Sequence, residues 1–569
     1  MIAIQRTLVA IGVAAAVAAC SESAPERRQA ESERPEPATV TEMRAHEPDA
    51  NEPSPALSGI ALKPSSPADR HWPNESPPSA PPRSPEPGYH GPAQDRENYA
   101  DFDDNGVVLA RLQPVSTFSI DVDTGAYSNV RRFLNEGRLP PPNAVRTEEL
   151  VNYFSYDYPA EPRPGEPFSL ATELGASPWH EGRHLLQVGL RANEPGGGDV
   201  PASNLVFLVD VSGSMDSPDK LGLLKTALKM LSRQLDADDR VSIVVYAGAS
   251  GVVLEPTAGN DTGAIERALD QLQAGGGTNG AAGIELAYRL ARQAFIDGGI
   301  NRILLATDGD FNVGMTDFES LKQRVSRERE SGVSLTTLGF GRGNYNDHLM
   351  EQLADSGDGN HAYIDTLNEA RKVLVDEMSS TLQTVARDVK IQVEFNPRVV
   401  REYRLVGYEN RALAAEDFNN DRVDAGEIGA GHTVTALYEL SLVNGGTPAV
   451  DPLRYGQQGM PAPLNSEFDD ELAFVKLRYK APGEDRSVLM SRPVFSRDRV
   501  EDPADHSEDF RFAVAVAGFS QLLRNNTAIA DFDFDGVLAL ATPARGADPF
   551  GYRSEFLNLV RTAQVLSQR

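Results

Sequence analysis

The chain of 569 residues is long enough for several domains of ordinary size. Charged residues make up 24% of it and hydrophobic residues 40%, the proportions of a globular protein that folds in water. Asp and Glu number 83 against 54 Lys and Arg, so the formal net charge is -29. This balance indicates a soluble acidic surface. It argues against non-specific binding to nucleic acid or to anionic lipid surfaces, which requires a basic face.

The first 19 residues, MIAIQRTLVAIGVAAAVAA, hold one Arg followed by an apolar run. A run of about 12 residues is too short to cross a ~30 Å hydrocarbon core and is typical of a signal peptide. Residues 17–20, VAAC, resemble the lipobox of bacterial lipoproteins, in which the cysteine is lipid-modified and becomes the first residue. We therefore predict a lipoprotein signal peptide over residues 1–20 and a lipid anchor in the membrane at Cys20, the only cysteine. An ordinary cleaved signal peptide beside a chance cysteine is the alternative.

Because Ser21 rather than Asp follows the cysteine, the same resemblance implies the outer membrane of the cell envelope, on its periplasmic side. Residues 21–96 contain 16 of the chain's 39 prolines, with Ser, Glu and Ala between them. Such a segment cannot bury enough apolar surface to offset its chain entropy. It is predicted to be a disordered, Pro-rich linker that acts as a stalk.

Folded sequence is predicted to begin near residue 97. The next hundred residues are expected to contain a strand, Thr117–Val122, and helices over Ala126–Glu136 and Thr147–Phe154. The strand ends in Asp121 and Asp123, within SIDVDTG. Haloacid-dehalogenase phosphatases begin with a similar DxDx(T/V) pattern. Here the fifth position is Gly125, and two carboxylates before a helix are interpreted as a cap and a turn.

Three other Asp-rich stretches resemble the first half of a calcium-binding EF-hand loop. Two of them lack the Glu that must come twelfth, and the third has Arg422 where the turn needs Gly. We interpret all three as solvated turns. They cover residues 101–106, 417–421 and 531–536.

Strands and helices alternate through the central part of the chain. The strands are apolar throughout, which predicts a mostly parallel sheet with helices on both faces, a Rossmann-like α/β fold. A short strand that closely follows its predecessor is interpreted as an antiparallel edge strand. The predicted strands are Leu205–Val211, Val241–Tyr246, Val252–Leu254 (the edge strand), Arg302–Ala306, Ser334–Phe340 and Ala362–Ile364. The predicted helices are Lys220–Leu235, Ala264–Leu272, Ala281–Phe295, Phe318–Glu330 and Asp347–Ala354.

Oxygen-bearing side chains follow two of these strands. The stretch NLVFLVDVSGSM places Asp210, Ser212 and Ser214 at alternate positions after a buried strand, and Asp308 follows the strand in RILLATDG. Ligands of open α/β sheets bind beyond the carboxyl ends of the strands, so these side chains are expected to converge there.

Together with Thr278 in GGGTNG, these residues resemble the metal-ion-dependent adhesion site of von Willebrand factor type A (VWA) domains. The resemblance implies a VWA domain over residues 203–386 and a Mg²⁺ (or Mn²⁺) site whose ligands are Asp210, Ser212, Ser214, Thr278 and Asp308. Mg²⁺ prefers hard oxygen ligands, which agrees with these residue types. The alternative, in which Ser and Asp only cap the following helix, leaves Thr278 and Asp308 unexplained.

The flanking sequences include STFSIDVDTGAYSNVRRFLNEGRLPPP before the VWA domain and DGVLALATPARGADPFGYRSEFLNLV after it. They resemble those of a bacterial family of VWA-domain lipoproteins, from about residue 97 to the C-terminus. The resemblance implies VWA-associated regions over 97–200 and 388–569, with α+β and β-rich character. Alternation in the second region predicts a sandwich-like module, followed by two helices. Its strands are Lys390–Phe395, Arg404–Tyr408, Thr433–Leu442 and Glu471–Tyr479, and its helices are Phe510–Leu523 and Gly551–Leu566.

We hypothesise from these features a membrane-anchored scaffold or binding protein. Its adhesion site would grip a Glu or Asp of a protein partner. The sequence lacks a Walker loop, GxSxG and HExxH, so we predict that it is not an enzyme. A metal-dependent envelope enzyme, or a chaperone subunit acting on envelope polymers or proteins, is the alternative. The candidate contact loops are 215–220, 248–251, 275–280 and 310–316.

Overall fold

The computed structural model describes residues 97–159, 166–193, 201–309, 318–343, 345–445, 448–450, 468–529 and 531–568. They belong to one compact unit, Tyr89–Arg569. The predicted signal peptide, Cys20, the stalk over 21–96 and the candidate loop 310–316 lie outside the described residues. Among the described helices, none combines the length and the apolar character needed to span a bilayer.

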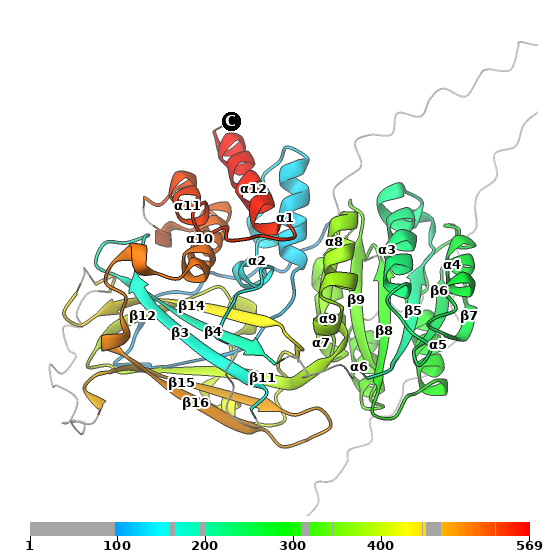
Figure 1. Cartoon of the computed structure of the whole chain (residues 1–569), viewed down its shortest axis with the longest axis horizontal. Coiled ribbons are helices and arrows are strands. Elements are labelled where there is room, and N and C mark those ends of the chain that lie inside the picture. Colours follow the sequence, from blue (N-terminus) through cyan, green and yellow to red (C-terminus); the bar gives the residue numbers. More distant parts are fainter. Residues whose placement is uncertain are drawn as a thin grey trace, which may run out of the picture. The chain divides into compact units, whose positions relative to one another are not determined.

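The centre of residues 203–386 is a six-stranded sheet (Figure 1). Its strands are β5 Ser203–Asp210, β6 Arg240–Tyr246, β7 Ser250–Ala258, β8 Ile300–Thr307, β9 Ser334–Phe340 and β10 His361–Ile364. Their order is β10-β9-β8-β5-β6-β7, and all neighbours are parallel except β7, the predicted antiparallel edge strand. Every residue of β5 and β8 is buried, as expected for strands covered on both faces. The VWA-like α/β fold is therefore confirmed.

Helices cover both faces of this sheet. They are α3 Leu223–Ser232, α4 Thr262–Asp270, α5 Gly280–Gln293, α6 Phe318–Arg329, α7 Asp347–Ser356, α8 Leu367–Arg371 and α9 Met378–Leu382. Leu205 and Phe207 of β5 pack with α3, α4 and α8, whereas Val206 and Leu208 pack with α5, α6 and α7. The predicted helix from Lys220 differs in its first turn, because a π-helical turn, Pro218–Gly222, precedes α3.

Two antiparallel sheets form the predicted sandwich, and they share one hydrophobic core. The first has the order β1-β12-β14-β4-β3, with β1 Val108–Leu109, β12 Val400–Val406, β14 Thr433–Leu442, β4 His184–Ala192 and β3 Phe168–Ala176. The second contains β13 Ile428–Gly429, β11 Thr384–Phe395, β15 Glu471–Lys480, β16 Val488–Phe495 and, paired to β11, β2 Val115–Ser119. Phe395 of one sheet stacks on Tyr403 of the other, with ring centroids 4.3 Å apart.

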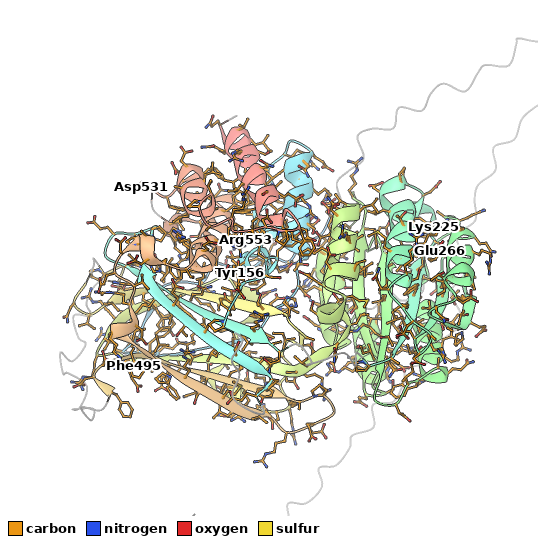
Figure 2. The ribbon with its side chains drawn as sticks, viewed as in Figure 1. Tyr156, Lys225, Glu266, Phe495, Asp531 and Arg553 are labelled. Atoms are coloured by element: carbon orange, nitrogen blue, oxygen red, sulfur yellow. The ribbon has the colours of Figure 1, made fainter. Side chains whose placement is uncertain are left out.

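Five helices lie over the outer face of the first sheet (Figure 1). They are α1 Gly125–Asn135, α2 Thr147–Asn152, α10 Glu508–Leu523, α11 Phe534–Ala541 and α12 Tyr552–Ser567. Their apolar side chains share a core with Leu185 and Leu437 of the sheet. Arg553 of α12 lies over the rings of Phe512 and, after α2, Tyr156 (Figure 2). This contact joins the last helix to the region before the VWA domain.

The two flanking regions are interleaved in this structure. Strand β4, which precedes the VWA domain in sequence, pairs with β14, which follows it. Strand β2 pairs with β11 in the same way. The sandwich therefore needs chain from both sides of the VWA domain, although the sequence indicated strands for it mainly in the second region.

Candidate metal site at the carboxyl edge of the central sheet

Asp210 is the last residue of β5 and is fully buried. One carboxylate oxygen accepts a hydrogen bond from the backbone N–H of Ser212 at 2.8 Å. The other accepts from the hydroxyl of Thr307, the last residue of β8, also at 2.8 Å. Asp210 is thus fixed between the two central strands, at the edge where the sequence predicted a site.

The two serines lie beside this carboxylate. The hydroxyls of Ser212 and Ser214 are 3.0 Å apart, and Ser214 is exposed whereas Ser212 is buried. The glycine-rich loop before α5 lies against the same turn, because Gly213 N–H donates to the carbonyl of Gly276 at 3.0 Å. Gly276 has a φ of +85°, which favours glycine. This loop carries Thr278, which is buried and two residues before α5.

Asp308 directly follows β8 and is fully buried. Its carboxylate accepts a hydrogen bond at 2.9 Å from the ammonium of Lys220, which lies in the π-helical turn before α3. Sequence reasoning included Lys220 only as the end of the candidate contact loop 215–220 and did not identify it as the partner of Asp308. A lysine six residues after the second serine gives no signal by itself, since it is equally typical of a helix surface.

The donor set fits a small divalent cation. Burial, together with the negative charge of Asp308, raises the pKa of Asp210 to about 6, although hydrogen bonds from Ser212 and Thr307 oppose the rise. Two buried carboxylates near one another favour a cation beside them, and the three hydroxyls supply further hard oxygens. The sequence-predicted ligands therefore supply hard oxygens of the kind that Mg²⁺ prefers, and Asp210 and Asp308 lie at the same edge of the sheet.

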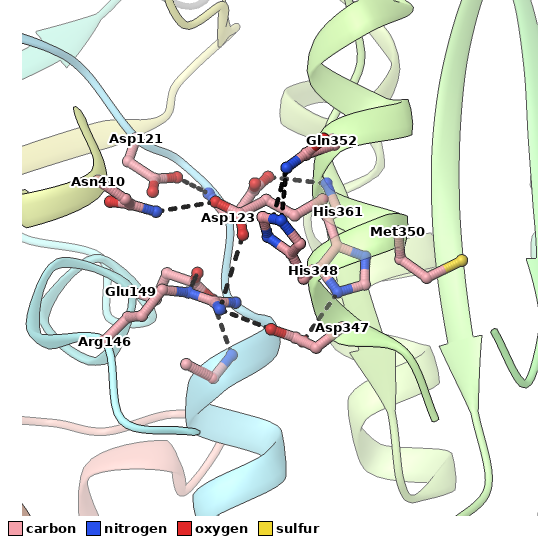
Figure 3. Close-up of polar contacts among 12 residues, drawn as sticks. Asp121, Asp123, Arg146, Glu149, Asp347, His348, Met350, Gln352, His361 and Asn410 are labelled. Carbon is pink, nitrogen blue, oxygen red and sulfur yellow. Dashed lines mark hydrogen bonds and ion pairs between the residues drawn. The ribbon is translucent and has the colours of Figure 1, made fainter. Parts of the chain in front are cut away.

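Asp121 and Asp123 lie elsewhere, in a buried polar network (Figure 3). The first accepts a hydrogen bond from the N–H of the second at 2.9 Å, which is the predicted turn. Asp123 does not cap α1. It accepts instead from the N–H of His361, the first residue of β10, at 2.7 Å. It therefore joins the region before the VWA domain to the edge of the central sheet.

Arginines neutralise much of this network. Arg146, before α2, pairs with Glu149 and, at 2.5 Å, with Asp347 of α7. Arg411 pairs with Asp121 at 3.0 Å and with Glu351 of α7 at 3.2 Å. Figure 3 shows Asp121, Arg146, Glu149 and Asp347 around this junction. We interpret this network as the set of contacts that attaches α7 to the flanking regions.

The three Asp-rich stretches, which were predicted to be solvated turns, each hold an Asp that accepts a hydrogen bond from a neighbouring part of the chain. Asp533 caps α11 by accepting from Gly536 N–H at 2.9 Å. Asp101 accepts from the amide of Asn143 at 2.9 Å, and Asp421 accepts from the hydroxyl of Ser487.

Comparisons with known proteins agree with this fold. Residues 204–377 match the family described as "von Willebrand factor type A domain", residues 93–187 match "von Willebrand factor", and residues 380–566 match "Uncharacterized protein YfbK, C-terminal". A protein of Escherichia coli K12, "Uncharacterized protein YfbK", is 48% identical over 471 residues, which cover 82% of this chain and 80% of that protein. The chain belongs to the YfbK family.

More distant similarities concern smaller parts of this YfbK-family chain. The protein sll0103 of Synechocystis is 27% identical over 55% of this chain and 70% of its own length. The magnesium-chelatase 60 kDa subunit of Rhodobacter capsulatus is 37% identical, but over only 20% of each chain. A solved von Willebrand factor type A structure from Catenulispora acidiphila covers 69% of this chain and 89% of its own, with 16% identity and a TM-score of 0.39. Proteins with this domain commonly bind a metal ion.

Proposed function

We propose that this protein is a lipid-anchored scaffold of the cell envelope that binds a protein partner through Mg²⁺ at the carboxyl edge of its VWA sheet. The observation that carries the proposal is the meeting of Asp210, Ser212, Ser214 and Asp308 at the ends of β5 and β8, with the loop of Thr278 hydrogen-bonded beside them. Mn²⁺ would be held by the same residues.

The proposed ligands would contribute to binding of the ion in two ways. Asp210 and Asp308 would supply the negative charge, and their burial keeps water from screening it. Ser212, Ser214 and Thr278 would supply neutral oxygens, so the ion would retain net positive charge. A bound Mg²⁺ would thus offer an electrophilic position to a carboxylate from outside.

The surroundings of the site support a protein partner. Ser214 and the glycines Gly248, Gly275 and Gly277 are exposed around the rim. Because the molecule carries a net charge of -29, most anionic surfaces would be repelled. A partner that delivers Glu or Asp directly to the ion, with complementary contacts to the rim, would still bind.

The metal is tested by titrating the full-length protein in detergent with Mg²⁺ or Mn²⁺ in a calorimeter. We expect one site in the wild type and a loss of at least tenfold in affinity for Asp210→Ala and for Thr278→Ala. Asp270→Ala is the matched control, because it removes the same charge from an exposed helix end, where Asp270 pairs with Lys229. Equal binding by all four proteins would exclude the proposed ligands.

The partner is tested by capture from an envelope extract in Mg²⁺ and in EDTA, with Thr278→Ala as a second negative control. A protein retained only by the wild type in Mg²⁺ is then changed at its surface Glu and Asp residues one at a time. We expect one replacement to abolish binding. Binding that survives chelation and every replacement would leave the metal no role in partner recognition.

A further inference from the structure

Lys220 places a positive charge inside the candidate metal site. Its ammonium donates to Asp308 at 2.9 Å, and both side chains are buried, at 9% and 0% exposure. A buried lysine is stable only when it is paired, and the contact with Asp308 contributes to holding the ammonium there. The site therefore contains a cation that belongs to the chain itself.

The aliphatic stem of the Lys220 side chain packs against the backbone that follows β9. It crosses the backbone of Gly341, just after β9, so closely that a Cβ there would lie 2.1 Å from Cε and 2.4 Å from Cγ of the lysine. Gly341 also has a φ of +74°. A side chain at residue 341 would occupy the space that this stem fills, so glycine there leaves room for the lysine to reach Asp308.

The ammonium and a bound divalent ion would compete for the same carboxylate. Asp308 is one of the two acidic ligands assigned above, and the other, Asp210, is held by hydrogen bonds from Ser212 and Thr307. A divalent ion beside Asp308 would also repel the lysine, because two positive charges would share one buried carboxylate.

We propose that Lys220 is a built-in counter-ion that a divalent metal must displace from Asp308, so that this residue sets the metal affinity of the site. The inference rests on the proposed function. It deepens that function, because Lys220 is the last residue of the candidate contact loop 215–220 and lies in the π-helical turn Pro218–Gly222. Metal binding would then be coupled to loss of the contact that holds this turn. The partner would therefore bind to a different conformation of the rim when the metal is present.

The main experiment compares metal binding by full-length variants. Lys220→Met removes the charge and keeps most of the stem, Lys220→Arg keeps the charge, and Lys229→Met removes a charge from the exposed face of α3. The probe is Mn²⁺, followed by the paramagnetic resonance signal of the free ion. We expect the dissociation constant to fall at least tenfold in Lys220→Met and to stay within about threefold of wild type in the other two.

The outcomes separate this inference from the function on which it rests. Binding by Lys220→Met that equals or is weaker than that of wild type overturns the inference and leaves the metal site standing. No Mn²⁺ binding by wild type or by Lys220→Met overturns both. Tighter binding by Lys229→Met as well would show a general effect of net charge and would also overturn the inference.

A second measurement needs no variant and covers the case in which Lys220→Met fails to fold. Hydrogen exchange of the wild-type backbone is followed with and without Mn²⁺. We expect exchange over residues 216–222 to become at least threefold faster when the metal is added, because the lysine no longer anchors the turn. Unchanged or slower exchange there, at saturating metal, would overturn the inference.

Discussion

Replacing Arg146 by Met is expected to weaken the whole folded unit, although this residue lies far in sequence from the VWA domain. Arg146 is 1% exposed and pairs with Glu149 of α2 and with Asp347 and Glu351 of α7. The substitution leaves these three buried carboxylates without their shared cation. Breaking a buried ion pair in this way costs about 3–5 kcal/mol.

The lower end of that range is expected for Arg146→Met. Burial raises the pKa of Glu149 to about 7 despite the nearby Arg146, so this carboxyl takes up a proton readily once the arginine is gone. Asp347 is different: burial alone would raise its pKa, but the charge of Arg146 and a hydrogen bond from His361 hold it well below the usual range. Loss of Arg146 therefore affects mainly Asp347. Because one buried ion pair is broken, we expect the free energy of unfolding to fall by about 3 kcal/mol.

The assay is urea unfolding of the full-length protein, followed by the fluorescence of Trp179, which is buried among the helices of the flanking regions. Arg233→Met is the control, because its pair with Glu266 is exposed and contributes at most ~1 kcal/mol. The double variant Arg146→Met/Asp347→Asn should recover part of the loss. An unfolding free energy for Arg146→Met within ~0.5 kcal/mol of wild type would refute the assigned role of this network.

Three further predictions concern pH, the anchor and the rim. In EDTA, the free energy of unfolding should fall as pH rises from about 5 to 8. Burial raises the pKa of Glu148 to about 8 and of Glu149 to about 7 from an ordinary 4.5. The folded state therefore binds more protons than the unfolded state in that pH range, and it loses this advantage as the pH rises. Greater stability at pH 8 than at pH 5.5 would contradict this. Cys20→Ser should leave the membrane fraction, and its retention after a high-salt wash would disprove lipid anchoring. Asp210→Ala/Asp308→Ala should keep a cooperative thermal transition, since both residues lie at the end of the sheet and not among its apolar side chains, but its midpoint should fall because Lys220 loses its pair with Asp308. A broad melt would contradict that.

The sequence predicted the central sheet closely because its signals are local. The apolar run before Asp210 and the run before Asp308 correspond to β5 and β8, and each predicted boundary lies within two residues of the structure. The convergence of these residues at one edge followed from a general rule for parallel sheets. Their placement needed no information about distant contacts.

What the sequence did not predict depends on partners far away in the chain. Strand β4 pairs with β14, about 250 residues later, and nothing within residues 184–192 identifies that partner. Asp123 was interpreted as a cap because the helix that follows it is close in sequence, whereas its actual partner is the backbone of His361. Lys220 was predicted only as the start of a helix and the end of a contact loop, because its pairing with Asp308 crosses 88 positions.

The arrangement of these contacts explains how the flanking regions can hold the VWA domain and still leave its metal edge open. Bonds from the flanking regions reach α7 and β10, through Arg146 to Asp347 and Asp123 to His361. They also reach α8, through Arg131 to Glu369, and the turn after β9, through Glu136 to Arg342. Strand β10 is at one edge of the sheet, two strands away from β8 and three from β5. The rim beyond β5 and β6, with exposed Ser214 and Gly248, lies on the other side of Asp308. A partner that docks on this rim therefore need not displace the buried junction, so the protein can bind at one side of the sheet while its own flanks secure the other.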